Sequence, residues 1–340
     1  RKLMGSEISV GHTVSPDEMG KYADYYGERF DYFTLKDVLN VSNLFDAAAT
    51  AKSGSEVNPQ VSLEKAAPVL KYCEENNIPI FGGAFIFEGR ATREFFRENF
   101  STYGYTVSRE VLQQRLENLI KNTFEALRTE YPNLKICGYE VCRNLFDADF
   151  PYLRGRDWSG EYDDWYEIYV NDESIYDAYT FARKYAPEGT KLYYSECNEY
   201  FPLKTMAVYK FVSDLQARGL IDGIGLEASL NTAYPYIDEY RTAVEVFSYT
   251  GLDIKLTRFQ ATVGENQQLY ADIISICRDL SKYISGVNFN YTGTDLKDDG
   301  SGKPDIAAIN EKKEAKKEEY SEETRKELME KAIGLHTDLK

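Results

Sequence analysis

The sequence predicts a single (β/α)8 barrel, in which eight parallel strands alternate with helices. Short apolar or β-branched runs recur between longer amphipathic stretches over most of the 340 residues. A chain of this length can hold one large barrel with an ample core, and alternation of strand and helix is typical of parallel α/β folds. A doubly wound sheet is the alternative architecture. In a barrel, the reactive groups would lie at the carboxyl ends of the strands.

Eight segments have the composition of buried strands. Each is short and rich in aliphatic, aromatic or β-branched side chains, which fit a pleated, buried surface. We expect strands at residues 3–10, 32–39, 78–87, 134–141, 191–195, 223–226, 254–259 and 286–289.

Four segments between these strands show helical periodicity. The clearest covers residues 109–131, where apolar side chains recur at the spacing of one helix face. The members of that face are Leu112, Leu116, Leu119, Ile120 and Phe124. The other three predicted helices cover residues 62–76, 203–218 and 267–283.

Two regions interrupt the alternation. Residues 147–164 follow the fourth predicted strand and are polar and aromatic, so in a barrel they would overhang the cleft as a specificity loop. The segment from residue 311 carries dense charge of both signs with few apolar side chains, which favours a solvated helix or a linker. We therefore predict a barrel over residues 1–310 and a charged helical tail over 311–340.

The composition disfavours several classes of function. Fifty-six Asp and Glu against 40 Lys and Arg give a formal net charge of −16, which repels nucleic acid and anionic lipid headgroups. The only two histidines, His12 and His336, lie near opposite ends, which argues against a Ser-His-Asp triad or an imidazole-rich metal site. The five cysteines lack CxxC spacing and are predicted to be mostly buried thiols. We expect no cofactor, no metal and no membrane insertion.

Three segments resemble the glycoside hydrolase family 10 xylanases in order and spacing. They cover residues 131–145, 164–194 and 204–230, and their most specific phrases are WYEI, LYY and IDGIGL. The resemblance extends over roughly residues 3–310. It implies a barrel that cleaves β-1,4-linked xylan with retention, through two carboxyl groups. It also implies a secreted or cell-surface location and membership of a larger polysaccharide-degrading protein.

The positions that match the two catalytic glutamates of the family carry other residues. Asn144 stands where the acid/base follows the fourth strand, and Arg258 stands at the nucleophile position on the seventh strand. An amide has no titratable proton near working pH, and a guanidinium has no lone pair for attack on an anomeric carbon. Our leading interpretation from the sequence is a non-catalytic barrel, a pseudoenzyme that serves as a carbohydrate-binding or scaffold module.

Two alternatives remain open at this point. The first is a glycoside hydrolase that acts on xylan, or on an acidic or substituted glycan, through relocated carboxylates. The carboxylates at or near predicted strand ends are Glu88, Glu140, Glu196 and Glu227. Their competing use is to neutralise buried arginines, for example Arg258 paired with Glu227 or Glu196. The second alternative is a structural, protein-interaction domain with a closed cleft.

A glycan-binding cleft would draw on polar and aromatic side chains at these strand ends. Arginine holds a sugar carboxylate in a bidentate fork, and aromatic rings of the 147–164 loop would stack on a sugar. The predicted substrate-binding residues are Arg143, Asn144, Glu227, Arg258, Asn290, Glu88, Glu196 and Trp158. The predicted partners are a xylan-type or acidic oligosaccharide and other modules of the same polypeptide.

Overall fold

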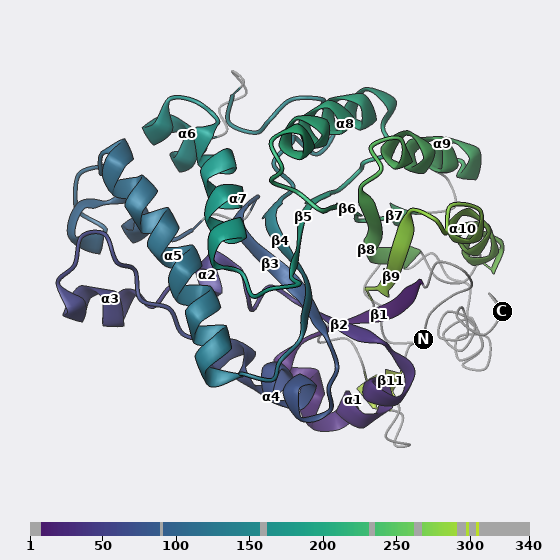
Figure 1. The fold of residues 1–340 in the computed structure, drawn as a ribbon, viewed down its shortest axis with the longest axis horizontal. Helices are drawn as coiled ribbons and strands as arrows, with labels where there is room; N and C mark the ends of the chain where they lie inside the picture. The colour runs from purple at the N-terminus through teal and green to yellow at the C-terminus, as the bar shows by residue number, and fades with distance from the viewer. Residues whose placement is uncertain are drawn as a thin grey trace.

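The computed structural model describes residues 8–88, 91–156, 162–230, 235–261, 267–290, 297–298 and 304–305. Eight parallel strands close into a barrel, which confirms the predicted fold class (Figure 1). Around the ring they are β1 (Ser9–Val14), β2 (Tyr32–Leu35), β3 (Ile80–Phe87), β4 (Ile136–Arg143), β5 (Lys191–Glu196), β6 (Gly223–Leu226), β8 (Asp253–Ala261) and β9 (Ile284–Phe289). Pairing of β6 with β8, and of β9 with β1, closes the ring.

Each connection between neighbouring strands of the ring carries a helix on the outside of the barrel (Figure 1). In chain order these helices are α1 (Pro16–Arg29), α4 (Ala67–Glu75), α5 (Arg109–Glu130), α7 (Glu173–Tyr185), α8 (Pro202–Ala217), α9 (Ile237–Ser248) and α10 (Gln267–Asp279). Shorter helices are α2 (Val41–Leu44), α3 (Ala47–Ser53), α6 (Asp164–Tyr169) and the 3-10 turns Glu64–Ala66, Arg93–Phe96 and Glu98–Phe100. Short strand β7 (Ser229–Leu230) extends the edge of β8, and β10 (Lys297–Asp298) pairs with β11 (Pro304–Asp305).

The first strand lies further along the chain than predicted. Residues 3–10 were expected, whereas β1 runs from Ser9 to Val14, and residues 1–7 are outside the described part. The prediction missed that polar His12 belongs to a strand buried on both faces. The His12 ring stacks on Tyr26 at 4.4 Å between centroids, and burial lowers its pKa to about 4. The other seven predicted strands overlap observed ones, and the predicted tail over 311–340 is also outside the described residues.

Helix α5 shows how closely local sequence sets the outer layer. Ser108 caps its first turn, where the hydroxyl accepts a hydrogen bond from the Val111 amide at 3.3 Å. All five apolar residues of the predicted face are buried against the barrel. The helix ends at Glu130, just before Pro132 in the sequence, close to the predicted boundary.

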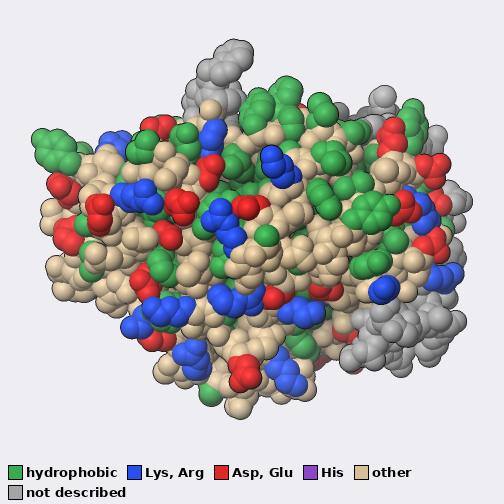
Figure 2. All heavy atoms as spheres, turned by 45° about the horizontal axis from the view of Figure 1, so that its top comes forward, with side chains coloured by type: hydrophobic (Ala, Val, Ile, Leu, Met, Phe, Trp, Pro, Cys, Tyr) green, Lys and Arg blue, Asp and Glu red, His purple; other side chains and the backbone are tan. Residues whose placement is uncertain are grey.

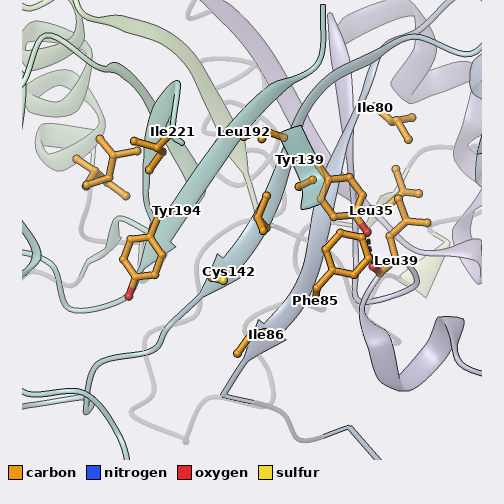
Figure 3. Close-up of a cluster of buried hydrophobic side chains, with 14 of the residues drawn as sticks. Leu35, Leu39, Ile80, Phe85, Ile86, Tyr139, Cys142, Leu192, Tyr194 and Ile221 are labelled. Carbon is orange, nitrogen blue, oxygen red and sulfur yellow. Dashed lines mark hydrogen bonds between the residues drawn. The ribbon is translucent and has the colours of Figure 1, made fainter. Parts of the chain in front are cut away.

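Aliphatic and aromatic side chains together fill the space between the strands and these helices (Figure 3). Tyr139 stacks on Phe85 at 5.0 Å, and its hydroxyl donates to the Leu39 carbonyl at 2.8 Å. The largest fully buried side chains include Tyr26, Tyr169, Tyr179, Tyr193, Tyr194 and Tyr240. Many of the 28 tyrosines therefore serve the core, each placing a large apolar ring inside.

One face of the molecule carries charges of both signs. Figure 2 shows basic and acidic side chains interspersed over the face turned forward, with hydrophobic side chains gathered toward its upper part. In the described ranges, no helix combines the length and apolar character needed to cross a bilayer. All five cysteines are free thiols, and Cys73, Cys142 and Cys277 are fully buried, which confirms the prediction for most of them.

Candidate functional site

A cluster of charged and amide side chains lies at the carboxyl ends of the barrel strands. We call it the mouth cluster; its members are Asp37 after β2, Glu88 after β3, Glu140 and Arg143 on β4, Asn144 after β4, Glu227 after β6 and Arg258 on β8. The structure thus brings together five of the predicted substrate-binding residues with Glu140, which was predicted as a strand-end carboxylate, and adds Asp37. Parallel strands point the same way in a barrel, so their ends meet at one face.

Asn144, at the end of β4, bridges two carboxylates that follow β3 and β6. Its Nδ2 donates to Glu88 Oε1 at 3.1 Å and to Glu227 Oε1 at 2.9 Å. These two distances limit the separation of the two Oε1 atoms to their sum, 6.0 Å. The Asn144 backbone has a φ of +50°, and its backbone N–H donates to the Ser195 carbonyl on β5 at 2.9 Å. This bond to β5 fixes the position of the side chain. The residue is buried.

Arg258 forms a bidentate ion pair with Glu140 across the barrel. Its Nη2 and Nη1 donate to Glu140 Oε1 at 2.6 Å and Oε2 at 2.9 Å. Burial would raise the pKa of Glu140, but the charge and hydrogen bonds of Arg258 outweigh it and hold that pKa below its ordinary value. Glu227 Oε1 lies 4.0 Å from Arg258 Nη1. The predicted pairing of Arg258 with Glu227 is therefore secondary to the pair with Glu140, and no contact with Glu196 is formed.

Arg143 also faces carboxylates. Its Nη2 lies 3.4 Å from Asp37 Oδ1, and its Nε lies 3.5 Å from Glu88 Oε2. Both arginines of the mouth cluster are thus neutralised by the protein's own acids, which is the use that burial of guanidinium groups favours. This geometry weakens the idea that they hold an acidic sugar.

Glu196 is placed away from the mouth cluster. Its side chain has no exposed surface and pairs with Lys204 Nζ at 3.0 Å, while the Tyr194 hydroxyl donates to it. Burial raises the pKa of this carboxyl despite the lysine. A group enclosed in this way holds the end of β5 to α8 and does not face a sugar in the cleft.

The remaining predicted residues divide into placed and undescribed ones. Asn290 is half-buried just after β9, where its backbone N–H donates to the Phe259 carbonyl at 3.0 Å. Trp158 lies outside the described residues. Two other aromatic residues of this loop, Phe150 and Tyr152, stack in parallel with 5.6 Å between their ring centroids. They are 53% and 38% exposed, as a platform that stacks on a sugar would require. In the ranges the structure describes, no group of three or more His, Cys, Asp or Glu is arranged to hold a metal ion.

Sequence reasoning missed Glu199 and Lys204. Glu199 Oε1 accepts from the Ala228 amide at 2.9 Å and from the Tyr240 hydroxyl at 3.2 Å, directly behind Glu227. Burial raises the pKa of Glu199 to about 7. Neither residue belongs to a motif in the sequence, because each is recognisable only from what the fold packs around it.

The chain belongs to glycosyl hydrolase family 10, whose family model matches residues 2–322. It is 39% identical over 283 residues to the bifunctional endo-1,4-beta-xylanase XylA of Ruminococcus flavefaciens, covering 82% of this chain and 29% of the relative. It is 32% identical to endo-1,4-beta-xylanase Y of Acetivibrio thermocellus, covering 62% of this chain and 20% of the relative. The chain therefore spans less than a third of the length of either relative.

Among solved structures, the chain is similar to the CBM22-1 and GH10 modules of the N-terminal endo-1,4-beta-D-xylanase 10B of Clostridium thermocellum, complexed with xylohexaose. The TM-score is 0.74 at 26% identity, over 83% of this chain and 59% of the other. Together with the family match, this confirms the resemblance inferred from the sequence.

The comparisons contradict our leading interpretation of a non-catalytic module. Relatives at up to 39% identity are named as endo-1,4-beta-xylanases. That interpretation rested mainly on Asn144 and Arg258, the residues that the sequence resemblance aligned with the two glutamates of the family. It gave too little weight to the carboxylates at other strand ends, two of which, Glu88 and Glu227, both accept hydrogen bonds from Asn144.

Proposed function

We propose that this barrel is a glycoside hydrolase that acts on a xylan-type glycan through a relocated carboxylate pair, Glu88 and Glu227. The observation that carries the proposal is the Asn144 bridge, which holds the two facing oxygens within 6.0 Å of each other. Retaining glycosidases place their two carboxyl groups about 5–5.5 Å apart, whereas inverting enzymes need about 6.5–9.5 Å. The upper limit of 6.0 Å on the separation of the two oxygens therefore favours a retaining mechanism. The xylan part of the proposal is supported by the relatives' names.

The other carboxylates of the mouth are less suited to the reaction. Glu140 is fully buried and bound through both oxygens by Arg258, and Glu196 is enclosed with Lys204. Glu88 and Glu227 retain exposed side-chain surface, 35% and 16% respectively. Only a carboxyl with open surface can reach a glycosidic oxygen or an anomeric carbon.

The surroundings of the pair indicate a role for each member. Glu227 is the deeper one and is oriented by Asn144 and by Arg258 Nη1 at 4.0 Å, as a nucleophile that must attack from a fixed position. Glu88 is more open to solvent, so it can exchange a proton with water between the two half-reactions. In this assignment Glu88 protonates the leaving oxygen and then activates the water.

The test is release of reducing sugar from unbranched xylan, with the anomeric configuration of the product followed by NMR. We expect release with retention, and a loss of about a hundredfold or more in both Glu88→Gln and Glu227→Gln. Glu188→Gln is the matched control, because Glu188 is exposed at the opposite end of the barrel, before β5. Full activity in both pair variants would refute the assignment, and no release by the parent chain would refute the proposed function.

A further inference from the structure

A cavity of about 150 Å³ lies beside the mouth cluster, between the ends of β3 and β4 and the start of α7. Glu88 and Asn144 line the cavity and also belong to the cluster, so the two share a wall. A cavity of this volume is large enough for about one six-membered ring. It therefore suits a single sugar unit and is too small for a stretch of glycan chain.

One wall of the cavity is aromatic. Phe87, Phe96 and Trp165 line it, and the rings of Phe96 and Trp165 meet edge to face at 5.1 Å. Trp165 is only 6% exposed, so the wall is fixed by packing before any ligand arrives. Aromatic rings offer an apolar surface to the C–H face of a sugar.

Two buried polar atoms in the same lining have no partner. Ser174, on the first turn of α7, is 1% exposed, and Asn144 is 5% exposed. Ser174 Oγ and Asn144 Oδ1 form no hydrogen bond with any residue that the structure describes. Buried polar atoms are rarely left without a hydrogen bond. Hydroxyl groups of a ligand could donate to Asn144 Oδ1, and they could donate to or accept from Ser174 Oγ.

The charges around the cavity favour a neutral ligand. Two arginines line it. Arg154 Nε donates to the Asn144 backbone carbonyl at 3.1 Å, and Arg156 is paired with Asp163 and with Asp172, whose Oδ1 lies 2.6 Å from Arg156 Nη2. Glu88, Asp163 and Asp164 add three carboxylates to the lining. These carboxylates would repel a carboxylate on the ligand. The Arg156 guanidinium, which is already paired, would not be available to bind it.

We propose that this cavity takes one neutral sugar carried as a branch on the glycan main chain, so that branched xylan is the preferred substrate. The shared wall places the branch beside Glu88 while the main chain lies across the mouth cluster. The inference rests on the proposed function for its substrate class, and it extends that function by naming the decoration.

The test is calorimetric titration of the full chain with three xylo-oligosaccharides of equal backbone: unbranched, arabinofuranosyl-branched and glucuronosyl-branched. We expect the arabinofuranosyl compound to bind at least about fivefold more tightly than the other two. Ser174→Ala should reduce that advantage about two- to tenfold, the range of one hydrogen bond, with affinity for the unbranched compound unchanged. Ser174→Leu should fill the cavity and abolish the advantage.

Thr180→Ala, exposed on the same helix, is the control that should keep the parental preference. Thermal unfolding shows whether each variant is folded. Equal affinity for branched and unbranched compounds would overturn the inference, and tighter binding of the glucuronosyl compound would overturn its neutral character. If the chain releases sugar from unbranched xylan but shows no preference for branched compounds, the cavity proposal alone is refuted. If it prefers a branched compound but releases no sugar, only the proposed hydrolase function is refuted.

Discussion

Removing Arg258 should leave a charge stranded inside the barrel. In Arg258→Met, the Glu140 carboxylate loses both of its hydrogen bonds, at 2.6 and 2.9 Å, while its side chain remains without exposed surface. Breaking a buried ion pair by removing one partner costs about 3–5 kcal/mol, because the remaining charge is left uncompensated. We expect a loss of that size in the free energy of unfolding at pH 7, measured by urea denaturation.

The pH dependence gives this prediction a second, independent readout. In the parent chain the pKa of Glu140 is held below its ordinary value, so its stabilising contribution is present above the unfolded-state pKa and is lost as pH falls through the folded-state pKa. Without Arg258, burial raises that pKa, and protonation relieves the stranded charge as pH falls. The difference between parent and variant should therefore shrink from pH 7 to pH 4.

Two comparison variants make the outcome decisive. Arg258→Met combined with Glu140→Leu should recover most of the loss, since it removes both charges. Arg183→Met breaks an ion pair with Asp222 of similar length, 2.8 Å, but both side chains are more than a third exposed, so its cost should stay below about 1 kcal/mol. A loss in Arg258→Met no larger than in Arg183→Met, or one that does not change with pH, would refute the reasoning.

Three further outcomes follow from single residues. The folded-state pKa of Glu199 is raised by burial to about 7, so its contribution to stability is complete below the unfolded-state pKa and is lost as pH rises through the folded-state value. Glu199→Gln should remove this fall, roughly 2 kcal/mol between pH 5 and 7, in urea titrations. Gly225→Ala would place a Cβ in close contact with Ser195 Oγ, so denaturation should show a loss of about 1–3 kcal/mol in the free energy of unfolding. An unchanged midpoint would show that the barrel interior rearranges to accept the methyl group. Asn144→Ala should lower xylan hydrolysis about tenfold to a hundredfold in kcat, because the two carboxylates lose their shared donor; parental kcat would contradict that role.

Much of the scaffold could be predicted because its determinants are local. The face of α5 and the start of α8 follow from apolar spacing and from Pro202 in its first turn. The first strand could not be placed, because His12 looks like a surface or functional residue until Tyr26 and Phe30 are packed against it. Its burial is a tertiary effect that no local pattern records.

The site was predicted as a set of strand ends but not as a set of partners. Sequence placed Glu140, Arg143 and Arg258 near one mouth, yet the pairing of Arg258 with Glu140 depends on which side chains of β4 point inward. The register of β4 against β5 shifts between Glu140 and Cys142, so the alternation of faces along the strand is interrupted there. A bulge of this kind decides the partner and leaves no signature in the sequence.

Asn144 and Arg258 are compatible with the carboxylates of the mouth cluster only as a set. A glutamate at the position of Asn144 would put a third carboxylate within hydrogen-bond distance of Glu88 and Glu227, and three such groups cannot all ionise. The amide removes that conflict and donates to both oxygens. Arg258 supplies positive charge to buried Glu140 and lies 4.0 Å from Glu227, so it offsets the acids that remain. Asn144 and Arg258 thus fit a charged, ordered mouth in which the Glu88 and Glu227 side chains keep exposed surface.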